Sequence, residues 1–347
     1  MICRLVIFLS LLPVMACSPV REGSVSVEYR AEVINPDWQG VAFFPAWNRF
    51  LAWGSDGSLK FSQNGVQWQA GESDLIEDLT MVAADWSGLT LMAIGANGSL
   101  ARSVDGGVRW KAPTRVLDDD LFALVPLAIP GGWVVSGARG SLLHSMDDGV
   151  SWSLQRVGEE DLLSLHVLPD GGTLLAGSRQ GRVLRSTDAG QSWRVLPALT
   201  DTPIVDIFAV GRRLIAGSAM GRLLVSEDDG INWRLIQLDS AGVVTTHAYD
   251  PEHAALVVGT HVGDLYSSRD GGRSWTVDKA GSHLTLSALH FDAQDKALLL
   301  FGHHGVLARS IDGGMEWGMQ PLPGKATLMG VALTVPGKES SEWARLG

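Results

Sequence analysis

Ser103-Val104-Asp105-Gly106-Gly107-Val108-Arg109-Trp110 is one of six copies of the pattern Ser-x-Asp-x-Gly-x-x-Trp in this chain of 347 residues. The six tryptophans that end the copies, together with one before them, lie 42, 42, 41, 40, 42 and 42 residues apart: Trp68, Trp110, Trp152, Trp193, Trp233, Trp275 and Trp317. A fixed period of about 40 residues is typical of a small supersecondary unit that buries its apolar face against its neighbours. The sequence therefore predicts a repeat protein.

Each copy of the pattern has the residues that a tight hairpin turn needs. The Asp105 carboxylate is placed to accept hydrogen bonds from the backbone N–H groups that follow it, and Gly107 to adopt the left-handed conformation. Trp110 then covers the hairpin and fills space between neighbouring units. Six equivalent carboxylates in separate units cannot converge on one substrate, so we assign a structural role to Asp105, Asp147, Asp188, Asp228, Asp270 and Asp312. The first unit departs from the pattern, with Gln63 in the aspartate position and Phe61 in the serine position.

Residues 119–157 show the content of one unit. The apolar segment 120–127 predicts a strand buried on both faces, and the segments 132–137, 141–145 and 150–154 predict three more strands with turns between them. Four short antiparallel strands form one blade of a β-propeller. Seven tryptophan positions predict seven blades. The expected fold class is therefore all-β, a seven-bladed β-propeller of four-stranded antiparallel blades.

The repeated pattern resembles the Asp-box of the bacterial neuraminidase-repeat (BNR) superfamily. Arginine precedes the serine in three copies, at Arg102, Arg185 and Arg309. With these arginines, a single ring and an envelope signal, the chain resembles the photosystem II stability/assembly-factor family over about residues 24–336. The resemblance implies a seven-bladed propeller that binds other proteins during the assembly of a membrane complex. Members of the family also occur in bacteria without photosynthesis, so the resemblance does not name the partner.

The first 16 residues have the features of a bacterial lipoprotein signal. Arg4 precedes an apolar run of 12 residues, Leu5 to Ala16, and Cys17 follows a small residue. We expect cleavage before Cys17, lipidation of Cys17 and a mature chain that faces the periplasm. In a Gram-negative source, Ser18 favours sorting to the outer membrane. An ordinary secretory signal or a short membrane anchor is the alternative, although a spanning helix needs about 20 apolar residues.

The expected organisation is a signal peptide at 1–16, a tether at 17–23, the propeller at 24–336 and a C-terminal tail at 337–347. Strands are predicted at 24–33 and 326–335. In a monomeric ring, pairing strands from both ends in one blade removes exposed strand edges, so we expect at least one chain end to join a blade in this way. The net charge of −11 disfavours nucleic acid as a partner.

One end of the predicted ring collects four arginines from three consecutive blades. In such blades, the turn between the second and third strands lies at the same end as the connection to the next blade. The turns carry Arg139, Arg179, Arg182 and Arg222, and the connections carry the acidic segments 72–78, 118–120 and 159–161. Arginine suits the recognition of carboxylates, so this end is a candidate docking surface for a partner protein. The alternative is a set of ordinary surface ion pairs, each contributing about 0–1 kcal/mol.

The sequence presents no catalytic, metal-binding or cofactor-binding motif. Histidines gather after residue 240, but their spacing matches no metal motif. His166, His247 and His290 occupy nearly matching positions in innermost strands, which favours hydrogen-bonded core or channel residues over ligands. Glycoside hydrolysis is the alternative function, because sialidases use Asp-box propellers. The sialidase Arg-Ile-Pro signature is absent and the chain has three tyrosines, so the sequence favours a non-catalytic, protein-binding propeller without a cofactor.

Overall fold

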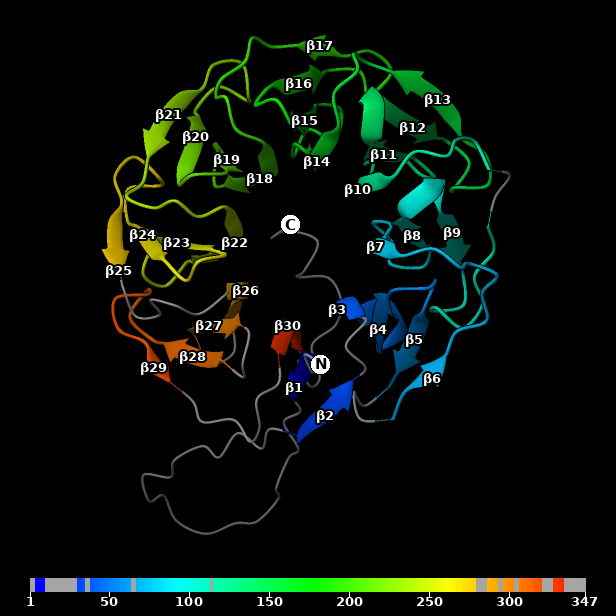
Figure 1. The fold of residues 1–347 in the computed structure, drawn as a ribbon, viewed down its shortest axis with the longest axis horizontal. Helices are drawn as coiled ribbons and strands as arrows, with labels where there is room; N and C mark the ends of the chain where they lie inside the picture. Colours follow the sequence, from blue (N-terminus) through cyan, green and yellow to red (C-terminus); the bar gives the residue numbers. More distant parts are fainter. Residues whose placement is uncertain are drawn as a thin grey trace.

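The computed structural model describes residues 4–9, 30–34, 38–63, 67–112, 115–278, 286–292, 296–302, 306–319 and 327–333. Seven small antiparallel sheets stand around a central axis, each with its first strand innermost (Figure 1). In the described residues, helix is confined to three short 3-10 turns: η1 (Pro45–Trp47), η2 (Ala96–Gly98) and η3 (Ala138–Gly140). A helix with the length and apolarity to span a bilayer is not found in this part of the chain. The predicted seven-bladed β-propeller is confirmed.

Blades 1 to 4 follow one another along the chain. Blade 1 contains β3 (Trp38–Phe44), β4 (Arg49–Gly54), β5 (Leu59–Ser62) and β6 (Gln69–Ala70). Blade 2 contains β7 (Leu79–Ala84), β8 (Leu91–Gly95) and β9 (Leu100–Ser103). Blade 3 contains β10 (Leu121–Pro126), β11 (Trp133–Gly137), β12 (Ser141–Ser145) and β13 (Ser153–Arg156). Blade 4 contains β14 (Leu162–Val167), β15 (Leu174–Ser178), β16 (Val183–Ser186) and β17 (Arg194–Val195).

Blades 5 to 7 complete the series. Blade 5 contains β18 (Ile204–Val210), β19 (Arg213–Ser218), β20 (Arg222–Ser226) and β21 (Arg234–Gln237). Blade 6 contains β22 (Val244–Asp250), β23 (Ala255–Thr260), β24 (Leu265–Ser268) and β25 (Thr276–Asp278). Blade 7 contains β26 (Leu286–Asp292), β27 (Ala297–Gly302), β28 (Val306–Ser310) and β29 (Gly318–Met319). Six blades have four strands, and the described part of blade 2 has three.

The fourth strand of blade 3 begins later than the sequence predicted. Its expected range was 150–154, but β13 starts at Ser153. The backbone N–H groups of Val150 and Ser151 instead donate to the Asp147 carbonyl and carboxylate, so these residues belong to the turn.

The turn between the third and fourth strands is closed from within, as the sequence predicted. We call it the Ser-Asp-Gly-Trp turn. In blade 2, Ser103 Oγ accepts a hydrogen bond from the N–H of Gly107 (2.9 Å) and donates to Asp105 Oδ1 (3.0 Å). The N–H of Arg109 donates to the same carboxylate oxygen over 2.9 Å. These three hydrogen bonds recur in blades 3 to 7. In five of the six turns the tryptophan indole also donates to the glycine carbonyl.

Each Ser-Asp-Gly-Trp turn also packs on the blade before it. Gly107 (φ +83°) lies so close to Leu51 of β4 that a Cβ atom on the glycine would be 2.4 Å from that side chain. In blades 3 to 7, a Cβ on the equivalent glycine would lie 2.7–3.1 Å from a side chain in the second strand of the preceding blade. A larger residue would therefore meet an unfavourable backbone conformation and a steric clash together. Glycine is needed here for the junction as well as for the turn.

The apolar core is divided among the junctions between blades. Trp110 is 5% exposed and packs with Leu51 and Trp53 of blade 1 and with Leu91 of blade 2. Five further clusters join each following pair of blades, up to blades 6 and 7. The tryptophans that end the later turns are half-buried against these clusters. A blade thus buries its faces only by contact with its neighbours.

A polar side chain of each blade reaches the turn of the next blade. At all six junctions from blade 1 to blade 7 it donates to a backbone carbonyl of the Ser-Asp-Gly-Trp turn, over 2.6–3.0 Å. The donors and acceptors are Arg49 and Gly106, Arg102 and Asp148, His144 and Ala189, Arg185 and Asp229, Arg213 and Asp270, and Arg269 and Asp312. We call these contacts the junction hydrogen bonds. The arginine that precedes the serine in two of the repeats, at Arg102 and Arg185, therefore connects blades.

Strands from the two ends of the chain share one sheet, which is separate from the seven blades. β1 (Arg4–Leu9) is antiparallel to β2 (Arg30–Ile34) and parallel to β30 (Thr327–Leu333). β30 lies against β3 of blade 1 and against β26 and β27 of blade 7. This terminal sheet therefore fills the gap between the first and last blades (Figure 1). The expectation that a chain end joins a blade is therefore wrong: blades 1 and 7 each have four strands from their own repeat.

We predict that Trp110→Ala destabilises the ring by about 3–5 kcal/mol, because it empties a buried site between blades 1 and 2. Urea unfolding followed by far-UV circular dichroism measures the change. Val104→Ala is the matched control in the same turn. Val104 is 53% exposed, so its loss should cost less than about 0.5 kcal/mol. A loss below about 1 kcal/mol for Trp110→Ala would mean that the indole does not hold the junction.

We also predict that the ring loses stability as the pH falls from about 4 to about 2. Hydrogen bonds of the turn hold the pKa of each of the six turn aspartates below 3.8, although burial acts to raise it. A serine side chain has the largest effect at Asp147, Asp188 and Asp270. For Asp147, the side chain and N–H of Ser151 lower the pKa to about 2. A carboxylate whose pKa is lower in the folded state stabilises the fold above its unfolded pKa, and this contribution disappears as the pH falls through the folded pKa.

The urea midpoint, measured at several pH values, tests this dependence. Asp147→Asn removes one titrating group, so its midpoint should change less steeply with pH than that of the unaltered protein. An unchanged midpoint between pH 4 and pH 2 would contradict the prediction.

Candidate functional site

The four arginines of the predicted docking surface lie on neighbouring turns. Arg139 is the middle residue of η3, between β11 and β12. Arg179 and Arg182 belong to the turn between β15 and β16, and Arg222 is the first residue of β20. The connections between blades reach the same turns, since the N–H of Arg139 donates to Asp161 Oδ1 in the connection from blade 3 to blade 4 (3.1 Å). We call this end of the ring the connection end.

Each of the four arginines is paired with a carboxylate of a connection. The pairs are Arg139 with Asp119, Arg179 with Asp161 (2.7 Å), Arg182 with Glu160 (2.9 Å) and Arg222 with Asp201. Three of these acids belong to the predicted acidic segments, and Asp201 does not. The structure therefore joins the predicted basic patch and acidic segments into ion pairs, which hold the guanidinium groups in place.

Asp119 is a buried member of these pairs. Besides Arg139, its carboxylate accepts hydrogen bonds from Ser141 Oγ (2.7 Å) and Arg156 Nη2 (2.8 Å). A buried charge requires such partners, because an unpaired one is strongly destabilising. The carboxylate thus fastens the connection before β10 to blade 3. The sequence gave no sign of this role, since Arg156 lies in the outer strand of the blade.

A second set of acids attaches turns at the connection end to the following connection. Asp56, Asn97 and Arg139 have left-handed backbones, with φ of 54°, 52° and 54°. Their N–H groups donate over 2.9–3.1 Å to the carboxylates of Asp78, Asp120 and Asp161, in that order. Burial raises the pKa of Asp161, but hydrogen bonds from Arg179 and Arg139 outweigh it and leave the pKa below 3.8. These three acids therefore have structural partners.

The three histidines of the inner strands differ in their partners. His247 of β22 has Nδ1 3.0 Å from Asp206 Oδ2 and stacks on Phe208, with ring centroids 3.6 Å apart. In the described part of the chain, Nε2 of His166 (β14) and Nε2 of His290 (β26) are buried without a hydrogen-bond partner. The prediction of hydrogen-bonded histidines is therefore wrong for these two atoms. Burial lowers the pKa of both side chains from 6.5, which keeps them neutral at pH 7.

The other groups considered for chemistry are dispersed. Tyr249 is exposed, whereas the hydroxyl of Tyr266 donates to the Asp239 carbonyl over 2.6 Å and burial raises its pKa. Among the residues that the structure describes, no group of three or more His, Cys, Asp or Glu side chains could hold a metal ion. Nδ1 of His261 accepts the N–H of Val243, and Cys17, His283, His303 and His304 lie outside the described residues.

Comparison with known proteins supports the fold. No protein-family model and no curated sequence matches the chain. Among solved structures, Sqt1 of Saccharomyces cerevisiae is 11% identical, with a TM-score of 0.67 over 81% of this chain and 84% of that one. A structure of YCF48 bound to D1 peptide is 19% identical, with a TM-score of 0.60 over 79% and 91%. YCF48 from Cyanidioschyzon merolae is 16% identical, with a TM-score of 0.59 over 79% and 96%. At such identities, these likenesses establish the propeller fold alone.

Proposed function

We propose that the chain is a non-catalytic, lipid-anchored propeller of the cell envelope that binds proteins and assists the assembly of a membrane complex. The connection end is its docking surface. One observation carries the proposal: Arg139, Arg179, Arg182 and Arg222 form an arc over three consecutive blades, and their side chains are 68%, 55%, 43% and 22% exposed although each is paired.

Paired arginines can still bind a partner. An exposed ion pair contributes only about 0–1 kcal/mol, so a carboxylate of an incoming protein can share or replace the resident one at little cost. The guanidinium group has five N–H donors, and a bidentate carboxylate engages two of them. The remaining donors can bind a second carboxylate. The resident acids also hold the arginines in position, which reduces the side-chain entropy that binding would otherwise cost. This arrangement favours a partner segment that carries acidic residues.

The structural likenesses are consistent with a protein-binding role. One similar propeller, YCF48, has been solved with a D1 peptide bound, and the sequence itself resembles photosystem II assembly factors. The turn aspartates of the six repeats are engaged by their own turns, which supports a non-catalytic protein over a glycoside hydrolase. Turnover of fluorogenic glycosides, lost on changing one central carboxylate, would defeat this proposal.

We predict that the triple change Arg139→Gln, Arg179→Gln and Arg182→Gln weakens capture of the partner at least about tenfold. The fold should persist, because each exposed ion pair contributes about 0–1 kcal/mol and Asp119 keeps its contact with Arg156. Crosslinking in membrane fractions, followed by quantitative mass spectrometry of the captured proteins, measures the effect.

The matched control changes three exposed arginines of other segments, Arg194, Arg212 and Arg234, to glutamine. This control loses the same number of positive charges. It therefore distinguishes the effect of losing the docking arginines from the effect of changing the net charge of the protein. Equal capture by both variants and the unaltered protein would remove the reason for placing the docking surface at the connection end.

We predict that Cys17→Ser releases the protein from membranes, because it removes the thiol that would be lipidated. Fractionation of cells into soluble and membrane material measures the change, and metabolic labelling with a fatty acid detects the modification. Retention of the variant in membranes together with unprocessed leader would instead support the membrane-anchor alternative.

A further inference from the structure

Two arginines face each other across the outer strands of blade 4. Arg185 of β16 and Arg194 of β17 are register partners in this antiparallel pair. Directly opposite residues have Cβ atoms about 4.5–5.5 Å apart, so like charges in these positions are destabilising. In blade 5, the residue equivalent to Arg194 is Arg234, which lies opposite Val225 instead. Blade 4 therefore places two positive charges together where the next blade has one.

Neither of these arginines has an acidic partner at ion-pair distance. In blade 2, Arg102 occupies the position of Arg185, and the carboxylate of Asp148 in the next blade is its ion-pair partner. Arg185 reaches only the backbone of the next blade, where its Nε donates to the Asp229 carbonyl over 2.9 Å. Among the residues that the structure describes, neither Arg185 nor Arg194 forms an ion pair. The two positive charges are therefore not neutralised by a direct contact.

Acids of the surrounding turns are engaged elsewhere. Asp188, between β16 and β17, accepts a hydrogen bond from the N–H of Ser192 over 2.8 Å. Asp170, between β14 and β15, accepts a hydrogen bond from the N–H of Thr173 over 2.8 Å. Burial raises the pKa of Asp170, but hydrogen bonds of its own turn and the charge of Arg185 leave it below 3.8. Asp170 therefore acts on Arg185 from beyond ion-pair distance.

A cavity of about 370 Å³ opens beside the arginine pair. Its lining comes from blade 4 and from the turn of blade 5: Arg185, Thr187, Ser192, Trp193, Arg194, Leu196 and Ile231. Asp229 lines a separate cavity, together with Arg212 and Arg213. Small-molecule sites have volumes of about 300–1,000 Å³. The cavity thus has the size of such a site, and its described lining carries two positive charges and no acid.

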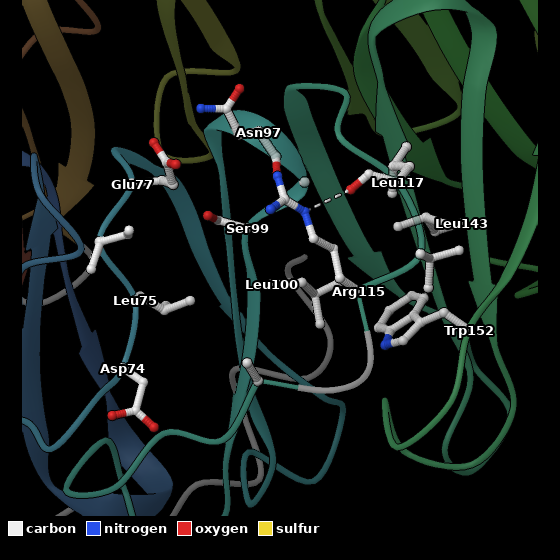
Figure 2. A pocket seen from close by; sticks show the side chains of 14 residues that line it. Asp74, Leu75, Glu77, Asn97, Ser99, Leu100, Arg115, Leu117, Leu143 and Trp152 are labelled. Carbon is white, nitrogen blue, oxygen red and sulfur yellow. Dashed lines mark hydrogen bonds between the residues drawn. The ribbon is translucent and has the colours of Figure 1, made fainter.

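The cavity between blades 2 and 3 has the opposite charge balance (Figure 2). Its lining includes Asp74 and Glu77 but one arginine, Arg115. Nε of Arg115 lies 2.7 Å from Asp118 Oδ1, so its charge is already paired. A positive lining is therefore a property of the cavity beside blade 4 and does not follow from the blade repeat alone.

The donors in this cavity suit a phosphate group. The hydroxyl of Thr187 has no hydrogen-bond partner in the described part of the chain, whereas Ser192 Oγ already donates to Asp188. A phosphate monoester carries a charge of about −1.5 to −2 at pH 7 and has three strong acceptor oxygens. It can therefore balance both guanidinium groups, which form bidentate hydrogen bonds with phosphates. A carboxylate carries one negative charge and would balance only one of them.

We propose that the cavity beside Arg185 and Arg194 binds a phosphate monoester that carries an apolar group. The two guanidinium groups and the hydroxyl of Thr187 hold the phosphate, and Leu196 and Ile231 contact the apolar group. The bound dianion also offsets the repulsion between the two arginines. The site uses none of the four arginines of the connection end, so the inference does not depend on the proposed function.

Calorimetric titration of the full chain with phenyl phosphate tests this site. We expect saturable binding, which Arg194→Gln weakens at least about tenfold. Arg234→Gln is the matched control, because it removes the same charge from the same strand position in blade 5, and it should leave the affinity unchanged. Phenylacetate, a monoanion, should bind at least about tenfold more weakly than phenyl phosphate. Absence of saturable binding, an equal effect of both variants, or equal affinity for phenylacetate overturns the proposal.

Thermal unfolding gives a second readout. Phenyl phosphate should raise the melting temperature of the unaltered protein more than that of Arg194→Gln, because a ligand that binds the folded state stabilises it. Without ligand, Arg194→Gln should melt no lower than the unaltered protein, since the change removes a contact between like charges. A lower melting temperature of the ligand-free variant would contradict the uncompensated charge on which the proposal rests.

Flotation with lipid vesicles distinguishes a lipid phosphate from a soluble one. Vesicles of phosphatidylcholine are compared with vesicles that also contain phosphatidic acid, whose phosphate is a monoester. If phosphatidic acid increases flotation of the unaltered protein and of Arg234→Gln but not of Arg194→Gln, the ligand is a lipid. If phenyl phosphate binds but phosphatidic acid has no effect on flotation, the ligand is a soluble phosphate monoester. Either result supports the site.

The two triple variants separate this site from the docking surface. The change of Arg139, Arg179 and Arg182 to glutamine should leave the affinity for phenyl phosphate intact. The control triple variant, which contains Arg194→Gln, should lose this affinity and keep partner capture. Loss of phenyl phosphate binding in the connection-end variant would place the phosphate on the docking arginines and overturn the site beside blade 4.

Discussion

A glycine at each junction lets the turn of one blade touch the second strand of the blade before it. Gly107 illustrates the constraint, since a Cβ atom there would lie 2.4 Å from Leu51. The close approach brings the turn carbonyls within reach of a side chain from the preceding blade, such as Arg49 or Arg102. It also brings the tryptophan against the shared apolar cluster. Turn closure, polar contact and burial thus depend on one small residue, and this arrangement repeats at the six junctions from blade 1 to blade 7.

The junction hydrogen bonds show that one geometry is reached from different sequence positions. Arg49 and Arg213 begin a second strand, Arg102, His144 and Arg185 lie in a third strand, and Arg269 follows one. All six donate to the same turn of the next blade. Blades 7 and 1 do not meet in this way, because the terminal sheet lies between them. Cleavage of the proposed signal would remove β1, the strand that lies between β2 and β30 in that sheet.

The connection end owes its character to arginines and acids that meet in pairs. Pairing lowers the net charge of the surface but fixes the direction of each guanidinium group, and direction matters more than charge for bidentate recognition of a carboxylate. Between blades 2 and 3 the surface differs, because a cavity there has an apolar lining that includes Leu75, Leu117 and Trp152. A rigid ring can hold two such surfaces apart, so that each is shaped by its own turns and connections.

The sequence by itself determined the repeat, the number of blades and the closure of each turn. These depend on contacts within one hairpin, such as Ser103 with Asp105 and Asp105 with Arg109, which lie two and four residues apart. The tertiary structure alone decided which acid pairs with which arginine and where the junction hydrogen bonds form. It also decided that Nε2 of His166 is buried without a hydrogen-bond partner among the described residues. The cavity between blades 2 and 3 was likewise decided by the tertiary structure. The reason is distance along the chain: Arg102 and Asp148 are 46 residues apart, and only the packing of one blade on the next brings them together.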